Sequence, residues 1–374
     1  MEYVDEFRDP ALARSVAARI RARLTTPRIL MEICGGQTHA ILRYGLEELL
    51  GPALTLVHGP DCPVCVTPLV LIDHAVALAR TPGVTLCTFG DMLRVPGSEG
   101  TLDAARAAGG DVRMVYSPLD AVRIAADEPT REVVLFAVGF ETTAPTHAAA
   151  VLAAARAGLA NFMVLAALVC VPPALEQLLG MPDCRIEGVL AAGHVCTVMG
   201  TAEYHALAAR HRVPIVVTGF EPLDILTGIE RCLVQLDAGR AVVENAYDRA
   251  VRDDGNAAAR QAVATVFEVA DREWRGLGVL PDSGLALRAA YRQYDATQRY
   301  PSRHAPAAEP AACIAGAILA GQRRPHECSA FGTACTPAHP LGAPMVSGEG
   351  ACAAYFRYRG RPRAAGLTPA AQAD

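Results

Sequence analysis

The chain has 374 residues, of which 20% are charged and 52% are hydrophobic, and its formal net charge is −5 at pH 7. This length allows two or three domains with separate cores, and the slight acidity provides no basic surface for nucleic acid. The N-terminus MEYVDEFRDP is not a secretory signal, and the longest apolar run, FMVLAALVCV, is too short to cross a membrane. We therefore expect a cytoplasmic protein with neither a nucleic-acid nor a membrane partner.

The predicted elements begin with a helix over 9–24, where Asp9 caps a helix that starts with Pro10. Short β-branched or apolar runs then alternate with alanine- and leucine-rich segments of helical length. This alternation predicts an α/β fold with parallel sheets and crossover helices. We predict strands at RILMEIC, LTLVHG, VTLCTF and VRMVYS, and then at EVVLFAVGF, FMVLAALVC, EGVLAAGHV and VPIVVTGF.

The order of these strands suggests two similar α/β domains, over 27–120 and 121–236, that face each other across a cleft. After about residue 236 the pattern changes to segments of helical composition, such as NAAARQAVATVFEVADREW, and then to a loop-rich tail. We expect a mostly helical and loop-built third domain over 237–374, with the helix over 9–24 packed on it. The last segment, AAGLTPAAQAD, is expected to be frayed.

Polar and glycine-rich motifs follow the ends of the predicted strands, where ligands bind in parallel sheets. Cys34 precedes two glycines and a predicted helix N-terminus, which stabilises a thiolate, so it is a candidate reactive thiol; a buried cysteine before an ordinary turn is the alternative. His39 is a thiolate partner, a ligand or an ordinary helix histidine. The motifs are CGGQTHA, GPDCPVC, FGDML, GFETTAPTH, GHVCTVMG and GFEPLD.

Cys62 and Cys65 are spaced to form a disulfide across a tight turn or to supply half of a zinc site. No nearby Cys/His pair has zinc-finger spacing, which favours a redox or transient-ligand role. In GFETTAPTH, threonine and proline suit a helix start, which leaves Glu141 free to bind a ligand or move a proton. His194 is a similar candidate, whereas Cys196 fits a small core residue.

Four cysteines lie near the C-terminus, separated by fourteen, six and sixteen residues: Cys313, Cys328, Cys335 and Cys352. Four thiolates suit an iron–sulfur cluster or a structural zinc, although the spacing matches neither a compact ferredoxin run nor a zinc ribbon. The flanking PHECSAFGTACTPAHP favours a loop around a cluster over a regular core. Isolated buried cysteines are the alternative.

Several segments together resemble the HypD family of hydrogenase maturation factors, in the order of that family's signatures. The resemblance implies two α/β domains and a third with a [4Fe-4S] cluster, a redox pair formed by Cys62 and Cys65, and Cys34 as a ligand of the iron under assembly. The segments are MEICGGQTHAI, HGPDCPVCVTP, GFETTAP, GHVCTVMG, GFEPLDIL, ENAYDRAV, WRGLGVLPDSGLALR and PHECSAFGTACTPAHPLGAPMVSGEGACAAY. The implied cluster ligands are Cys313, Cys328, Cys335 and Cys352, and the implied polar cleft residues are Thr38, His39, Glu141, Thr142 and His194.

The resemblance also implies partners and a task. With the small protein HypC, the chain would be a scaffold for the Fe(CN)2CO group of nickel–iron hydrogenase, rather than a conventional enzyme. HypE would supply the cyanide, and the group would pass to the precursor of the hydrogenase large subunit. The alternatives are an iron–sulfur protein-disulfide oxidoreductase, in which Cys34 attacks the partner, and a zinc-stabilised interaction protein.

The chain departs from the family pattern at two positions. Asp61 stands where the family usually has glycine, and its negative charge disfavours the thiolate of Cys62. Pro344 stands where many members have a further cysteine. Because four other cysteines remain, we expect that the missing thiol is not an essential cluster ligand.

Overall fold

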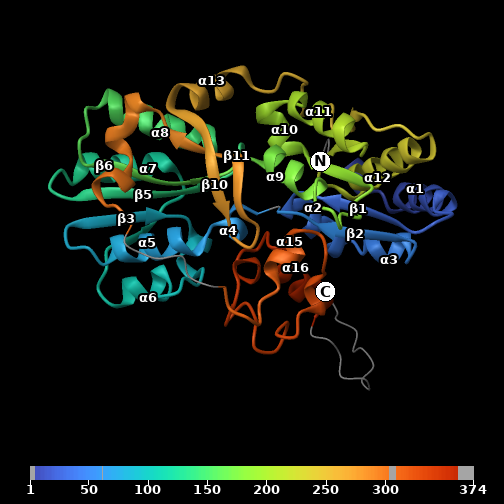
Figure 1. Cartoon of the computed structure of the whole chain (residues 1–374), viewed down its shortest axis with the longest axis horizontal. Coiled ribbons are helices and arrows are strands. Elements are labelled where there is room, and N and C mark those ends of the chain that lie inside the picture. Colours follow the sequence, from blue (N-terminus) through green and yellow to red (C-terminus); the bar gives the residue numbers. More distant parts are fainter. Residues whose placement is uncertain (1–4, 61, 303–308, 361–374) are drawn as a thin grey trace.

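The computed structural model describes residues 5–60, 62–302 and 309–360 (Figure 1). Asp61 and the segment AAGLTPAAQAD, for which the sequence suggested a charge effect and a frayed end, lie outside the described residues. Within the described ranges the chain forms two parallel sheets, a β-hairpin that runs between them and a C-terminal region beneath both. The predicted α/β fold class is confirmed.

In the described part of the chain the larger sheet, sheet A, has five parallel strands, and the smaller, sheet B, has four. Their inner strands are almost wholly buried, as expected where helices cover both faces of a parallel sheet. The order in sheet A is β2 (Leu54–His58), β1 (Arg28–Glu32), β7 (Gly188–Ala192), β8 (Ile215–Thr218) and β9 (Val243–Asn245). The order in sheet B is β4 (Val112–Met114), β3 (Val84–Thr88), β5 (Glu132–Gly139) and β6 (Phe162–Leu168).

All eight predicted strands are present, but their division between the sheets differs from the predicted boundary at residue 120. β3 and β4 pair with β5 and β6, whereas β1 and β2 join β7 and β8. In the sequence, the strands of sheet B therefore lie between β2 and β7 of sheet A. A continuous apolar run indicates a buried strand but does not indicate which strand lies beside it.

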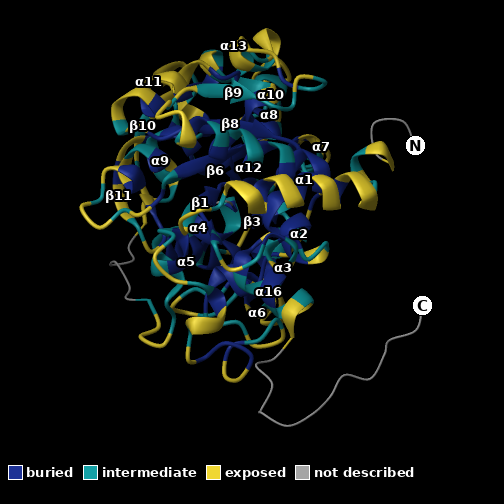
Figure 2. Ribbon diagram, turned by 90° about the vertical axis from the view of Figure 1, so that its right-hand side faces the viewer, coloured by how far each residue is buried: buried dark blue, intermediate teal, exposed yellow. Residues whose placement is uncertain are grey.

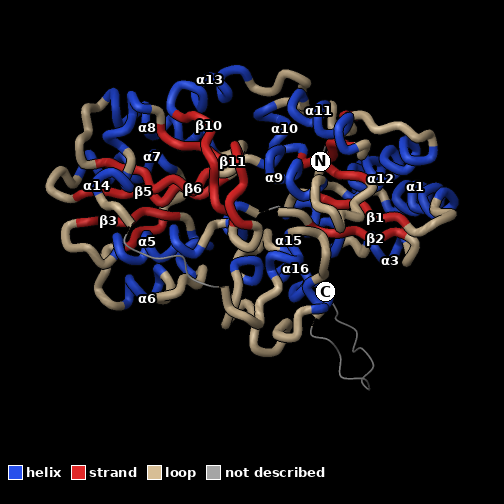
Figure 3. Tube along the Cα trace, in the orientation of Figure 1, coloured by secondary structure: helices blue, strands red, loops and turns tan. Residues whose placement is uncertain are grey.

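Helices cover both faces of each sheet (Figure 3). Alternate strand residues point to opposite sides, and apolar side chains on both sides pack against helices. Leu30, for example, packs with α12, and Met31 packs on the opposite side with α9. Sheet A is covered by α1 (Pro10–Arg23), α2 (Gly35–Arg43), α3 (Leu46–Leu50) and α12 (Pro222–Asp237) on one face, and by α9 (Val171–Leu179), α10 (Gly193–Met199) and α11 (Ala202–His211) on the other. Sheet B is covered by α5 (Leu69–Ala79) and α6 (Leu102–Ala107), and on its other face by α7 (Pro118–Asp127), α8 (Ala144–Arg156) and α13 (Ala257–Val266).

The N-terminal helix corrects one prediction, because α1 packs on sheet A and not on the C-terminal region. Asp9 caps α1 as predicted, accepting the backbone N–H of Ala11 and Leu12. Figure 2 shows the outer face of α1 exposed, while Ile20 is buried with residues of α12. An ion pair between Arg19 and Glu230, with the closest atoms 2.6 Å apart, also joins the two helices.

The hairpin corrects a second prediction, because the helical segment NAAARQAVATVFEVADREW ends at Val266. The remaining FEVADREW forms β10 (Phe267–Trp274), which pairs antiparallel with β11 (Gly278–Leu287). Arg288 Nε donates to the carbonyls of Ala264 and Phe267, which gives these carbonyls at the C-terminal end of α13 a hydrogen-bond donor. This cap comes from beyond the hairpin, so local composition does not reveal it.

The C-terminal region is built mainly from loops and short helices, as predicted. It contains α15 (Ala315–Leu319), η4 (Pro325–Glu327), η5 (Ala343–Met345) and α16 (Ala351–Arg359). The other short elements are η1 (Asp5–Arg8), α4 (Pro63–Val66), η2 (Gly90–Arg94), η3 (Ala289–Tyr294) and α14 (Ala296–Arg299). Across residues 5–60, 62–302 and 309–360, no helix combines the length and the apolar character that crossing a membrane requires.

Candidate functional site

Cys34 lies at the N-cap of α2, directly after β1, and His194 lies in the first turn of α10, directly after β7. Because β1 and β7 are neighbouring parallel strands, their carboxyl ends share one edge of sheet A. There Cys34 Sγ and His194 Nδ1 are 3.5 Å apart, although 160 residues separate them in the chain. The structure thus brings two of the predicted site residues together.

Burial determines the charge of the histidine in this pair. Cys34 is 4% exposed and His194 is half-buried. Desolvation lowers the pKa of His194 to about 4, so its imidazole is neutral near pH 7. A neutral imidazole can accept the thiol hydrogen through Nδ1 or, as the other tautomer, donate to a thiolate. The ring of Phe220, just after β8, lies 5.4 Å from the His194 ring between centroids.

The two glycines after Cys34 are required by close packing. A Cβ on Gly35 would lie 2.5 Å from the carbonyl oxygen of Glu349 in the C-terminal region. A Cβ on Gly36 would lie 2.9 Å from Cδ1 of Phe220. Glycine therefore lets both the C-terminal region and the aromatic ring approach the Cys34 loop.

Cys62 and Cys65 flank the first turn of α4, which follows β2. The N–H of Cys65 donates to Sγ of Cys62 at 3.2 Å, which orients that sulfur. Cys62 and Cys65 are 0% and 1% exposed. Val66, the next residue, belongs to the same buried apolar cluster as Cys34, and the pair itself is buried rather than at the surface.

Glu141 and Thr142 lie in the turn between β5 and α8, where the sequence placed them. Oε1 of Glu141 accepts the N–H of Val171 at 2.7 Å, whereas Oε2 is buried without a hydrogen-bond partner among the described residues. Glu141 lines a cavity of about 300 Å³ together with Cys170 and Glu203. Cys34 and His194 are not among the residues that line this cavity. The candidate residues therefore do not all line one cleft, contrary to the prediction from the sequence.

We expect Glu141→Gln to flatten the pH dependence of stability. Burial raises the pKa of Glu141 from 4.5 to about 8. Between these values the folded chain keeps a proton that the unfolded chain has lost, so the free energy of unfolding falls as pH rises, by at most roughly 1.4 kcal/mol per pH unit. Urea unfolding at about pH 5.5 and pH 7.5 should show a smaller loss in the variant than in the wild type.

The matched control for this comparison is Glu268→Gln, an exposed carboxyl on the wall of the same cavity. It should keep the wild-type pH dependence. An equal loss of stability in wild type and Glu141→Gln over the same interval would contradict the assignment.

The backbone N–H of Thr38 donates to the Cys34 carbonyl within α2, but the Thr38 and His39 side chains have hydrogen-bond partners other than Cys34 Sγ and His194. The Thr38 hydroxyl donates to Oε1 of the buried Glu32. His39 faces α16 instead, with Nδ1 3.2 Å from the hydroxyl of Tyr358 and Nε2 close to the carbonyl oxygen of Gly348. Of the two candidate histidines, His194 is therefore the one beside Cys34.

Sequence reasoning missed three buried polar residues behind Cys34, namely Glu32, His58 and Tyr355. Glu32 and His58 occupy the last positions of the neighbouring strands β1 and β2, and Tyr355 lies on α16. Each is at most 1% exposed. The available signal was the carboxyl of Glu32 inside the apolar run RILMEIC, because a buried charge requires hydrogen-bond partners.

The four C-terminal cysteines, which come from separate loops and α16, line one small apolar cavity: Cys313, Cys328, Cys335 and Cys352. Cys335 Sγ accepts the N–H of Leu341 at 3.3 Å, and a Cβ on Gly342 would lie 2.6 Å from Sγ of Cys313. Pro344 lines the same cavity, so the position that departs from the family pattern faces the four thiols.

The four thiols around this cavity are a donor set that suits a [4Fe-4S] cluster. Within the described ranges, no group of three or more His, Cys, Asp or Glu side chains is placed to hold a single metal ion. A [4Fe-4S] cluster binds each thiolate to a different iron, which spaces the ligands more widely. The apolar lining and the N–H donor at Cys335 are also features that tune such clusters.

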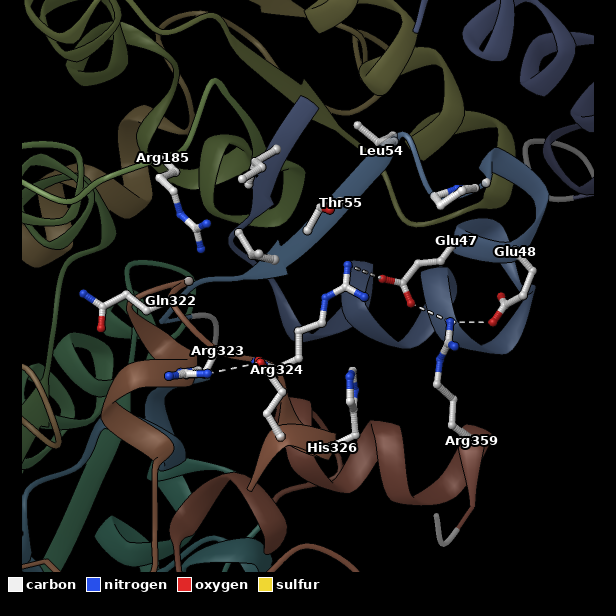
Figure 4. Close-up of a pocket in the computed structure, with 16 residues that line it drawn as sticks. Glu47, Glu48, Leu54, Thr55, Arg185, Gln322, Arg323, Arg324, His326 and Arg359 are labelled. Carbon is white, nitrogen blue, oxygen red and sulfur yellow. Dashed lines mark hydrogen bonds and ion pairs between the residues drawn. The ribbon is translucent and has the colours of Figure 1, made fainter. Parts of the chain in front are cut away.

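A third cavity, of about 680 Å³, lies between the edge strand β2, α3 and the C-terminal region (Figure 4). Arg324 pairs with Glu47, and Arg359 lies between Glu47 and Glu48. Its described lining includes none of the predicted site residues. These ion pairs instead fasten the C-terminal region to sheet A.

The sequence matches the family model HypD, described as "Hydrogenase formation hypA family", over residues 11–359. The chain belongs to the HypD family. It is 50% identical over 368 residues to "Hydrogenase maturation factor HypD" of Rhizobium leguminosarum bv. viciae, covering 96% of each chain. It is 48% identical over 373 residues to the Rhodobacter capsulatus protein of that name, covering 96% of this chain and 99% of the relative. It is 44% identical over 367 residues to the Escherichia coli (strain K12) protein, covering 96% and 98%.

Membership of the HypD family confirms the resemblance that the sequence motifs suggested. The relatives extend over nearly the whole of this chain, so the thiol–histidine pair and the cysteine-lined cavity both lie inside the shared region. The roles of individual residues in this HypD-family chain stay predictions.

Proposed function

We propose that this chain is a hydrogenase maturation factor that acts, with HypC, as the scaffold for assembling the Fe(CN)2CO group of nickel–iron hydrogenase. The family match and the names of the relatives support the maturation role. The observation that carries the scaffold role is the meeting of Cys34 and His194 at the edge of sheet A. A thiolate is a suitable ligand for low-spin iron, and the neutral imidazole fixes the direction of the sulfur before iron binds.

Cys62 and Cys65 are proposed as the electron source. Closing a disulfide between them breaks two S–H bonds, forms one S–S bond and releases two protons and two electrons, which would be available for the attachment of ligands to the iron. The N–H of Cys65 donates to Cys62 Sγ and so holds that sulfur in place for this step. A [4Fe-4S] cluster held by Cys313, Cys328, Cys335 and Cys352 would supply one-electron redox chemistry.

The proposed partners follow from this task. HypC would share the iron, HypE would supply the cyanide, and the finished group would pass to the precursor of the hydrogenase large subunit. The cytoplasm is the proposed location. Protein-disulfide oxidoreductase activity is the alternative, but the 4% exposure of Cys34 speaks against its attack on a partner's disulfide. Catalytic reduction of a test disulfide by the purified protein would favour that alternative.

The proposal is tested by measuring iron, sulfide and zinc, with a visible spectrum, on protein purified without oxygen. About four irons and four sulfides per chain are expected. Protein co-purified with HypC should contain additional iron and show cyanide and carbonyl infrared bands. Zinc without sulfide, from cells able to build clusters, would contradict the cluster, and the absence of these bands from the complex would contradict the scaffold role.

A further inference from the structure

A buried chain of hydrogen bonds links the Cys34 loop to helix α16. Oε2 of Glu32 accepts the backbone N–H of Cys34 at 2.9 Å. Oε1 of Glu32 accepts from the Thr38 hydroxyl and contacts Nδ1 of His58. The other ring nitrogen of His58, Nε2, lies 3.2 Å from the hydroxyl of Tyr355. The chain thus runs from β1 through β2 to the C-terminal region.

The direction of each hydrogen bond follows from the chemistry of the groups. A carboxylate only accepts, so Nδ1 of His58 is assigned the hydrogen, and in a neutral ring Nε2 is then left as an acceptor. The Tyr355 hydroxyl is then the donor to Nε2. Glu32 receives three donors, which offsets the cost of burying its carboxyl in the sheet. Removing the Tyr355 hydroxyl would leave Nε2 of His58 buried without a donor.

Helix α16 also carries Cys352, one turn before Tyr355, and Cys352 lines the cysteine cavity. One turn after Tyr355, the Tyr358 hydroxyl meets His39 on α2. Both tyrosines therefore contact residues outside α16, but by different routes. Tyr355 reaches the Cys34 backbone through His58 and Glu32, whereas Tyr358 ends at His39.

We propose that Glu32, His58 and Tyr355 are positioning residues that hold the Cys34 loop in place and make the reactivity of Cys34 depend on where α16 places the Tyr355 hydroxyl. The coupling to the cysteine cavity rests on the proposed function, because filling that cavity is what would reposition Cys352 and with it α16. The positioning of Cys34 by these residues does not require an iron–sulfur cluster. It follows from the hydrogen bond between Cys34 N–H and Glu32 and from the groups that orient Glu32.

The test measures the rate at which iodoacetamide alkylates Cys34 in purified, full-length, metal-free protein, by mass spectrometry of the Cys34 peptide. Tyr355→Phe removes one oxygen and preserves the packed ring. Because it leaves a buried acceptor unsatisfied, we expect alkylation of Cys34 to be about tenfold faster at every pH. Cys232, fully buried against the same sheet, should keep its wild-type rate in the same sample.

Tyr358→Phe is the matched control, because it removes the neighbouring hydroxyl of the same helix and should leave the rate at Cys34 unchanged. Equal acceleration of Cys34 and Cys232 in Tyr355→Phe would mean general loosening and would overturn the proposal, as would an unchanged rate at Cys34. Glu32→Gln gives a second test if Tyr355→Phe does not fold. It weakens the hold on Cys34 N–H directly and should accelerate Cys34 selectively; an unchanged rate would also overturn the proposal.

The coupling is tested by repeating the measurement after reconstitution with iron and sulfide. In wild type, loading should change the Cys34 rate, and in Tyr355→Phe the rate should no longer respond. An identical response in both proteins would overturn the coupling. If the wild type takes up neither iron nor sulfide, the proposed function fails, whereas the metal-free comparison still decides whether these residues position Cys34.

Discussion

Cys34→Ala is expected to lower hydrogenase activity at least about 100-fold in cells that depend on this chain for maturation, since replacing even an outer partner of a metal ligand costs 10- to 100-fold. The substitution removes the sulfur proposed to bind the iron and leaves His194 without its thiol neighbour. It should not disturb the helix, because the Cys34 side chain makes no capping hydrogen bond. Hydrogenase activity of complemented cells and the visible spectrum of the purified variant are the measurements.

Two outcomes separate ligand loss from misfolding. The spectrum of Cys34→Ala should match that of the wild type, because Cys34 does not line the cavity of the four C-terminal cysteines. Cys196→Ala, a buried core thiol two residues from His194, is the control and should retain maturation. Wild-type hydrogenase activity in Cys34→Ala would contradict the assigned role of Cys34.

Cys335→Ser is expected to lower the iron and sulfide bound to the protein at least about tenfold, since a structural cluster uses four thiolates. Cys335 is 7% exposed, lines the cysteine cavity and accepts the N–H of Leu341. A serine hydroxyl is a poor substitute for a thiolate at iron. The measurement is the iron and sulfide content, with the visible spectrum, of protein purified without oxygen.

The control for this variant is Cys184→Ser, a half-buried thiol that does not line the cysteine cavity. It should bind as much iron and sulfide as the wild type. An unchanged iron–sulfur spectrum in Cys335→Ser would exclude Cys335 as a cluster ligand.

The sequence predicted the strands well and their pairing poorly. Runs such as EVVLFAVGF are long, apolar and β-branched, which suffices to identify a buried strand. The neighbour of each strand depends on where the chain goes after the intervening helix. The sequence therefore predicted Cys34 and His194 separately, and only the adjacency of β1 and β7 brings them together.

His39 illustrates a second limit of sequence reasoning. It lies five residues after Cys34, which suggested a thiolate partner. At about 100° per residue, five helical positions rotate a side chain by roughly 140° from the starting direction, so His39 faces α16. Tyr355 was out of reach of such reasoning, because its contact with His58 joins residues 297 positions apart.

The insertion of sheet B between β2 and β7 also determines the order in which the chain can fold during synthesis. The ribosome makes β1 and β2 first, but β7 does not exist until Ala192 has been added. By then every strand of sheet B has already been made. Closing a loop of this length is entropically costly and slow compared with local folding. While the strands of sheet B are being made, the nascent chain therefore contains Cys34 but not yet His194. The site is assembled only late in biosynthesis.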